Sequence, residues 1–298
     1  MNKNEEQQIT QQMLNVYQGI LFQHQEFESG NVEDFVYEFD CPEFKELRNQ
    51  YNLVEIAGEG TDFARAKRIL HNLAPRISHS SWYDNHIECN ALRLLEYSLD
   101  QPEQGINCLN KAKILAECCL ALGIAARRVR IMPFSPYDFD NHVVTEIYDR
   151  NLEKWIMLDL TTDGYFIDES KTPLSLLEMR SRFANAEFIT FAHTTDSLND
   201  PQKLRIKHLS TNMYICKNLF YFQAEQVSTF GGKGKFLYFA PVHYSIQLTK
   251  QANFKYRLDY LPAEHIVIRK QLEENISRST LEQEPPKTNI QILMKKPS

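Results

Sequence analysis

Residues 107–123, NCLNKAKILAECCLALG, predict a helix more clearly than any other segment of the chain. Asn107 is a favourable N-cap, because its side-chain oxygen can accept a hydrogen bond from a free amide of the first turn. Gly123 suits the left-handed position that follows a helix. Between these two residues the apolar side chains cover most of the helix circumference. A helix that is apolar on nearly every side belongs in the interior of a domain.

Directly after this helix the spacing of apolar residues changes from the helical period of about 3.6 to the strand period of about 2. The alternation predicts strands at 129–134, 142–148 and 154–161. The sequence therefore predicts an α+β domain in which a buried helix packs on an antiparallel sheet.

The turn at 149–152 sets the register of the last two strands. If it closes symmetrically about Arg150 and Asn151, residues whose numbers sum to 301 face each other, and His142 opposes Asp159. Directly opposed side chains have β-carbons about 4.5–5.5 Å apart, so we expect a hydrogen bond between the imidazole and the carboxylate. A change of one residue in the loop would shift this register.

The chain divides into four predicted parts. A helical segment spans 1–54 and the main domain spans 55–200. The polar stretch TTDSLNDP at 194–201 marks the end of the main domain. Beyond it we expect a β-rich extension at 201–280 and a flexible tail at 281–298.

Smaller elements follow from the spacing of apolar residues. Intervals of three and four predict helices at 5–28, 61–73, 90–99 and 173–184. Alternating and aromatic residues predict the strands of the extension at 213–223, 227–230, 235–240 and 255–260.

The composition excludes several classes of protein. Of the 298 residues, 43% are hydrophobic, which is enough for a sizeable core. The net charge is −6 and no basic cluster is long, so nucleic acid is not expected as a partner. No run of about 18 apolar residues predicts a membrane span. The polar, acidic N-terminus lacks the pattern of a secretory signal, so we expect a cytoplasmic protein.

The six cysteines are expected to be thiols, since disulfides are rare in the cytoplasm. No C-x-x-C pair is present, and the adjacent Cys118 and Cys119 on a helix are a poor start for a tetrahedral zinc site. These two residues lie in the apolar part of the helix, which favours inert, buried thiols over a redox role. We therefore expect no metal and no cofactor.

Cys108 occupies a different position, the first residue of the predicted helix. The free amides and partial positive charge of a helix start stabilise a thiolate, the nucleophilic form of cysteine. The alternative is a small buried hydrophobic residue, which is what most free cysteines are. His142 and Asp159 favour the nucleophile, because an imidazole oriented by a carboxylate can exchange protons with the sulfur.

These residues resemble the transglutaminase-like superfamily of papain-like cysteine enzymes. The resemblance rests on Asn107-Cys108-Leu109 at a helix start, on DNHVVTE at 140–146 and on KWIMLD at 154–159. The order Cys, His, Asp and the separations of 34 and 17 residues match the family pattern. The similarity is strongest over residues 105–180.

The resemblance implies a papain-like, transglutaminase-like core and a cysteine-dependent amide hydrolase or acyl transferase of the peptidase, amidase or transamidase type. By this resemblance Cys108 is the nucleophile of a thioester acyl-enzyme, His142 the general base and acid, and Asp159 the orienting residue. The implied substrate is a peptide or protein amide. The oxyanion donor is expected to be the Cys108 amide, and further candidates are the side chains of Gln104, Asn107 and Asn141.

Two alternatives stay open at this point. Leu109 follows Cys108 where calcium-dependent animal transglutaminases carry an aromatic residue, and no acidic calcium-binding loop is present, so hydrolysis is favoured slightly over transamidation. The second alternative belongs to another class of function: a catalytically silent transglutaminase-like module that binds or scaffolds peptides. The aromatic residues of the extension would then provide its binding surface.

Overall fold

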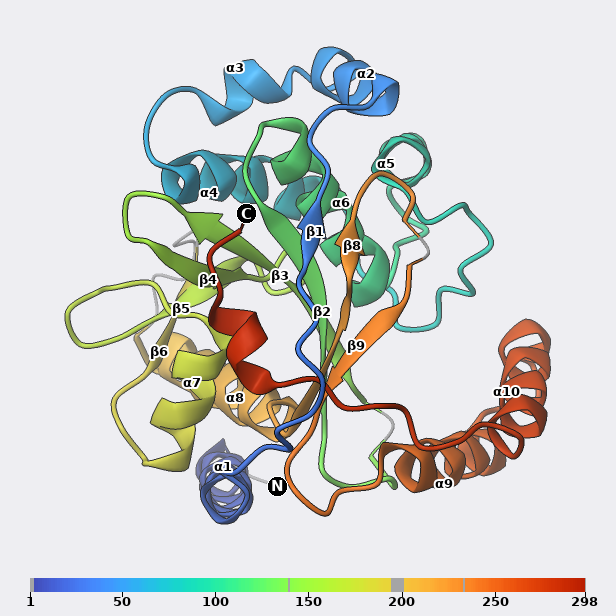
Figure 1. The fold of residues 1–298 in the computed structure, drawn as a ribbon. Coiled ribbons are helices and arrows are strands. Elements are labelled where there is room, and N and C mark those ends of the chain that lie inside the picture. Colours follow the sequence, from blue (N-terminus) through green and yellow to red (C-terminus); the bar gives the residue numbers. More distant parts are fainter. Residues whose placement is uncertain (1–2, 139, 194–200, 233, 298) are drawn as a thin grey trace.

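The computed structural model describes residues 3–138, 140–193, 201–232 and 234–297 (Figure 1). The α-helices are α1 (Lys3–Gln23), α2 (Pro42–Gln50), α3 (Leu53–Ala57), α4 (Asp62–Leu73), α5 (Ala91–Asp100), α6 (Cys108–Ala121), α7 (Leu176–Ala184), α8 (Pro201–Asn218), α9 (Ile246–Tyr260) and α10 (Ile266–Ser279). The strands are β1 (Val36–Tyr37), β2 (Ala126–Met132), β3 (His142–Asp149), β4 (Lys154–Leu158), β5 (Gly164–Ile167), β6 (Thr190–His193), β7 (Tyr221–Glu225), β8 (Val227–Ser228) and β9 (Phe236–Phe239). Two short 3-10 helices are η1 (Ala74–Arg76) and η2 (Ile290–Met294).

The central sheet has the strand order β4-β3-β2-β7-β9, and all its neighbours are antiparallel. Val129 of β2 lies opposite Val144 of β3 on one side and Ala224 of β7 on the other. The predicted α+β class is confirmed. Because β7 and β9 complete this sheet, the C-terminal third of the chain is part of the main fold.

Helix α6 lies at the centre of the molecule, against β2 and β3 (Figure 1). Twelve of its 14 residues are buried. Two of its three buried charged residues form an ion pair, since Lys113 lies 3.0 Å from Glu117. The third, Lys111, donates a hydrogen bond to the carbonyl of Ile77 over 2.7 Å. Glu117 also accepts hydrogen bonds from the amides of Ala91 and Gly231. These partners remove most of the cost of placing charge in the interior.

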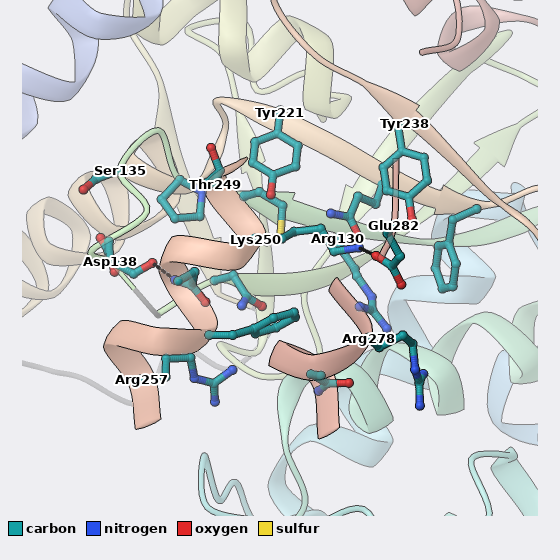
Figure 2. Close-up of a pocket in the computed structure, with 18 of the residues that line it drawn as sticks. Arg130, Ser135, Asp138, Tyr221, Tyr238, Thr249, Lys250, Arg257, Arg278 and Glu282 are labelled. Carbon is teal, nitrogen blue, oxygen red and sulfur yellow. Dashed lines mark hydrogen bonds and ion pairs between the residues drawn. The ribbon is translucent and has the colours of Figure 1, made fainter. Parts of the chain in front are cut away.

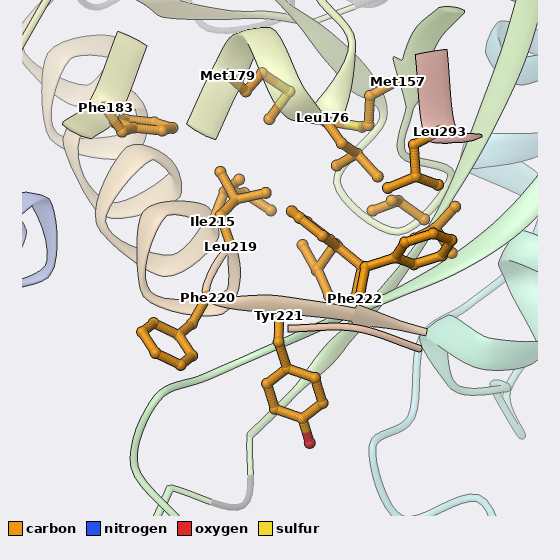
Figure 3. Close-up of a cluster of buried hydrophobic side chains, with 14 of the residues drawn as sticks. Met157, Leu176, Met179, Phe183, Ile215, Leu219, Phe220, Tyr221, Phe222 and Leu293 are labelled. Atoms are coloured by element: carbon orange, nitrogen blue, oxygen red, sulfur yellow. The ribbon is translucent and has the colours of Figure 1, made fainter. Parts of the chain in front are cut away.

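The sheet separates two hydrophobic clusters. One holds helices α1, α7 and α8 against the sheet, and its residues include Met157, Leu176, Met179, Phe183, Ile215 and Phe222 (Figure 3). The other holds α2 to α6 and includes Leu115, Cys118 and Ile147. The alternation of side chains along β3 explains the division, because Val144 enters the first cluster and Ile147 the second.

The predicted register between β3 and β4 is wrong by two residues. Thr145 pairs with Leu158 and Tyr148 with Trp155, so paired residue numbers sum to 303. The loop keeps the expected length of four residues but lies one position later, at 150–153. The carboxylate of Asp149 accepts hydrogen bonds from the amides of Asn151 and Leu152 and so holds the loop in this position. A shift of two residues keeps every side chain on its face of the sheet.

The expected β-rich extension at 201–280 is not confirmed, although the expected strands at 227–230 and 235–240 are present in part as β8 and β9. Helices α8, α9 and α10 occupy most of this range, and the expected strands at 213–223 and 255–260 fall mainly in α8 and α9. Leu209, Met213 and Cys216 are spaced by four and three residues and all contact the first hydrophobic cluster, which is a helical stripe. A short apolar run fits either period, and the packing partner decides which one forms.

Residues 281–297, the described part of the expected flexible tail at 281–298, pack on the fold. Leu293 of η2 is buried, and its carbonyl accepts a hydrogen bond from the Arg127 guanidinium. The indole of Trp155 donates to the carbonyl of Lys295 over 2.9 Å. The tail is polar in sequence, but these two donors and a few apolar residues anchor it.

Residues 194–200 of the expected domain boundary lie outside the described residues. No helix in the described ranges combines the length and the apolar character that a membrane crossing requires.

Candidate active site

Cys108 is the first residue of α6, and the cap that the sequence predicts is present. The Asn107 side-chain oxygen accepts a hydrogen bond from the Asn110 amide over 3.2 Å. The side chains of Asn107 and Asn110 both donate to the side-chain oxygen of Asn85, at 3.0 and 2.7 Å. The helix start is therefore tied to the loop around residue 85, and Cys108 remains partly exposed.

His142 and Asp159 form a buried pair. The ring Nε2 of His142 lies 2.8 Å from Oδ2 of Asp159, and both side chains are almost fully buried. Asp159 also accepts hydrogen bonds from the Thr162 hydroxyl (2.6 Å) and the Thr161 amide (2.8 Å). The two residues meet diagonally across the hairpin instead of directly opposite each other, because the register is shifted.

The protonation states follow from this pairing. Burial lowers the pKa of His142, but the charge of Asp159 and hydrogen bonds to Asp159 and Cys108 raise it to about 10 overall. Burial raises the pKa of Asp159, yet the charge and hydrogen bond of His142 outweigh it, so the pKa is lowered. At neutral pH the pair is an imidazolium with a carboxylate.

The His142 ring contacts Cys108 as well as Asp159. The Cys108 side chain lies beside the ring and helps to raise the pKa of His142, and Nδ1 is the ring nitrogen left to face the sulfur once Nε2 faces Asp159. On its other side the ring meets Tyr214 of α8 edge-on, with ring centroids 5.4 Å apart. The Tyr214 hydroxyl donates to the Asp140 carboxylate, and burial raises the pKa of Tyr214.

A cleft of about 780 Å³ opens in front of these groups, and we call it the Cys108 cleft. Cys108, His142, Asn107 and Asn141 line it, together with residues of the loop 79–85 and of helix α10. Gln104 is exposed and does not line it, so this candidate is not supported. Its position in the turn before the helix directs it to solvent.

Two backbone amides are available beside the sulfur. Within the described residues the amides of Cys108 and Leu109 have no hydrogen-bond partner, since the Asn107 cap serves Asn110. Free amides of this kind are a property of every helix start. They provide a ready site for an oxyanion that forms on a carbonyl attacked by Cys108.

The sequence alone does not predict several of the residues that line the Cys108 cleft. His79, Trp82 and Asn85 come from an irregular loop, and Tyr214 comes from a helix more than 70 residues after His142. Only the density of aromatic and histidine residues in HSSWYDNH at 79–86, without a helical or strand period, is a signal in the sequence. Nothing local connects this segment to Cys108.

The described part of the chain contains no group of three or more His, Cys, Asp or Glu side chains arranged for a metal ion. Comparison with protein-family models, with curated proteins and with solved structures gave no significant match.

Proposed function

We propose that the protein is a cysteine-dependent amide hydrolase or acyl transferase with a transglutaminase-like, papain-like core, and that Cys108, His142 and Asp159 are its catalytic triad. One observation carries the proposal. A single imidazole is hydrogen-bonded to a buried carboxylate at 2.8 Å and lines one cleft with a partly exposed thiol at a helix start. Nucleophilic cysteine catalysis needs this combination.

The chemistry begins with the Cys108 sulfur as a thiolate beside the His142 imidazolium. The sulfur attacks the carbonyl carbon of an amide, a C–S bond forms, and the carbonyl electrons move to the oxygen. The amides of Cys108 and Leu109 stabilise this oxyanion. The imidazolium then gives its proton to the leaving nitrogen, the C–N bond breaks, and a thioester remains on Cys108.

The second half of the reaction releases the acyl group. Neutral His142 removes a proton from water or from an amine, which attacks the thioester carbon and displaces the sulfur. Water gives hydrolysis, and an amine gives transamidation. We favour hydrolysis with a peptide or protein amide as substrate, since a cleft of about 780 Å³ lined by polar side chains is accessible to water. A reducing compartment such as the cytoplasm suits a free nucleophilic thiol.

The test is covalent trapping of the nucleophile. The protein is incubated at neutral pH with a glutamine-based peptide electrophile, and the adduct is located by mass spectrometry. We expect the adduct on Cys108, formed at least about tenfold faster than on any other cysteine, because this thiol lies at a helix start beside the positively charged His142 ring, which favours the thiolate. The matched control is Cys41→Ala, which removes another partly exposed thiol.

The Cys41→Ala variant should keep the labelling rate, and Cys108→Ala should lose the adduct. Equal labelling of Cys41, Cys89 and Cys108 in the wild type would contradict catalysis. It would leave the catalytically silent binding module as the better account.

A further inference from the structure

A second pocket of about 570 Å³ adjoins the Cys108 cleft (Figure 2). Five residues line both, namely Asn85, Arg130, Asn141, Arg257 and Asn275. The strands β2, β7 and β9 supply one wall, and helices α9 and α10 supply the other. We call it the arginine pocket, because Arg130, Arg257 and Arg278 line it.

The acidic side chains of the arginine pocket already have basic partners. Asp138 lies 2.9 Å from Lys217, and Glu282 lies 3.4 Å from Lys250. In contrast, no ion pair of Arg130, Arg257 or Arg278 occurs among the described residues. Arg130, Lys250, Arg257 and Arg278 thus outnumber the two acidic side chains that line the pocket, and its lining carries an excess of positive charge.

Arg130 provides an independent sign of a missing acceptor. Its Nε atom is buried and has no hydrogen-bond partner in the described part of the chain. Its guanidinium lies over the Phe236 ring, 5.0 Å from the centroid. A buried donor without an acceptor is costly, whereas an anionic oxygen would satisfy it.

The position of Arg130 connects this charge to the reacting groups. Arg130 of β2 lies opposite Val143 of β3, the residue directly after His142. Residues paired across antiparallel strands have Cα atoms about 4.5–5.5 Å apart. Successive side chains of a strand point to opposite faces, so this pairing brings Arg130 beside Val143 and not beside the His142 ring. Arg130 nevertheless lines the Cys108 cleft together with Cys108 and His142. An anion held by Arg130 in this cleft would therefore face an amide bound at Cys108. Arg257, from the facing helix, reaches both cavities.

We propose that the arginine pocket binds an anionic group of the substrate, so that the preferred substrates are peptide amides with a carboxylate or phosphate near the reacting amide. This inference rests on the proposed function for the reaction at Cys108. Guanidinium groups bind carboxylates and phosphates through paired hydrogen bonds. A volume of about 570 Å³ accommodates a whole side chain, and Phe236 and Tyr238 offer apolar surface for its stem.

The experiment compares three peptide electrophiles that differ in one residue next to the reactive glutamine: glutamine, glutamate or phosphoserine. The rate of Cys108 adduct formation is measured at low and high salt. We expect the anionic probes to react about 10- to 100-fold faster than the neutral probe, the range of a charge-assisted hydrogen bond. The ratio of the two anionic probes identifies the preferred source of the anion.

The variants are Arg257→Gln and Arg130→Gln, with Lys255→Gln as the matched control. Lys255 is an exposed cation on the same helix as Arg257 and lines neither cavity. Both arginine variants should lose the preference for anionic probes, and Lys255→Gln should retain it. Arg257 lies on the helical wall, so its variant tests the pocket even if Arg130→Gln does not fold.

Equal rates for all probes in the wild type would overturn the inference and leave the proposed function intact. If no probe labels Cys108, binding of the glutamate and glutamine peptides to Cys108→Ala is measured by calorimetry. Tighter binding of the glutamate peptide that Arg257→Gln abolishes would then support the pocket without the reaction. Equal binding would overturn the pocket too.

Discussion

The two walls of the Cys108 cleft are built in different ways. Helix α6 carries the cysteine and buries twelve of its 14 residues. The opposite wall is the hairpin of α9 and α10, which stands at the margin of the molecule (Figure 1). The buried residues of these two helices are Ile246, Gln247, Leu272 and Ser279. The reacting groups thus belong to the most packed part of the protein.

The hairpin is held mainly by polar and ring contacts. Glu284 accepts hydrogen bonds from the amides of Ile246 and Gln247 at the start of α9. Near the far end Trp82 stacks on His265 with centroids 4.4 Å apart, and Gln271 donates to the carbonyl of Asp84. Segments with few buried apolar contacts open at low free energy, so we expect the α6 wall to be rigid and the hairpin wall adaptable.

The largest expected effect concerns the rigid wall. Asp159→Asn removes the charge that keeps His142 protonated and oriented, while the shape of the side chain is preserved. We expect turnover, or the rate of acylation of Cys108, to fall about 10²- to 10⁴-fold. Circular dichroism should show an intact fold. A rate within threefold of the wild type would contradict the role of Asp159.

A pair of leucine substitutions compares the walls directly. Leu115 on α6 is fully buried, whereas Leu248 on α9 is 68% exposed. Leu115→Ala should lower the free energy of unfolding by about 2–5 kcal/mol, since it leaves a cavity in the core. Leu248→Ala should change it by less than about 0.5 kcal/mol. Urea unfolding measures both, and similar losses would contradict the comparison.

The His142–Asp159 pair predicts how stability depends on pH. The pKa of His142 is raised from 6.5 to about 10 on folding, so its contribution is complete below pH 6.5 and is lost as the pH rises toward 10. In that interval the folded state binds more protons than the unfolded state, and the free energy of unfolding falls by at most about 1.4 kcal/mol per pH unit.

The Asp159 carboxyl acts at the other end of the pH scale. Its pKa is lowered from 3.8, so its contribution is present above pH 3.8 and is lost as the pH falls through the folded value.

Urea unfolding of the wild type and of His142→Gln from pH 4 to pH 10 isolates the contribution of the His142–Asp159 pair. The difference between the two proteins should shrink as the pH rises above 6.5. A constant difference would argue against a charged pair.

The smallest expected effect concerns the hairpin wall. Trp82→Ala removes the ring that stacks on His265, a contact worth about 0.5–1.5 kcal/mol. Hydrogen exchange should become faster for the amides of α10 and stay unchanged for those of α6. Equal acceleration in both helices would mean that the walls open together.

The sequence indicated the core of the fold well, because local signals there agree with tertiary packing. The capped, apolar helix was predicted within two residues of its ends, and the strands after it within three. The prediction of strands in the C-terminal region was mainly wrong for the opposite reason, because local signals there do not agree with the packing. Its aromatic and apolar runs are short, and Tyr256 and Tyr260 contact each other at a helical spacing that alternation had disguised.

The hairpin register shows how an error can leave a site intact. The prediction placed His142 directly opposite Asp159, but the side chain of Asp149 reorganises the loop and moves the pairing by two residues. Because side chains alternate with a period of two, both residues stay on one face. Asp159 then lies diagonally from His142, still within hydrogen-bond distance.

The sequence by itself determined the three chemical groups and the helix start that presents the sulfur, since these depend on residue type and on short-range capping. Only the tertiary structure decided what surrounds them. The loop at 79–85, Tyr214, Arg130 and Arg257 come from distant segments, and their meeting at one cleft depends on which hydrophobic faces pack together. The spacing of residues along the chain does not predict that packing.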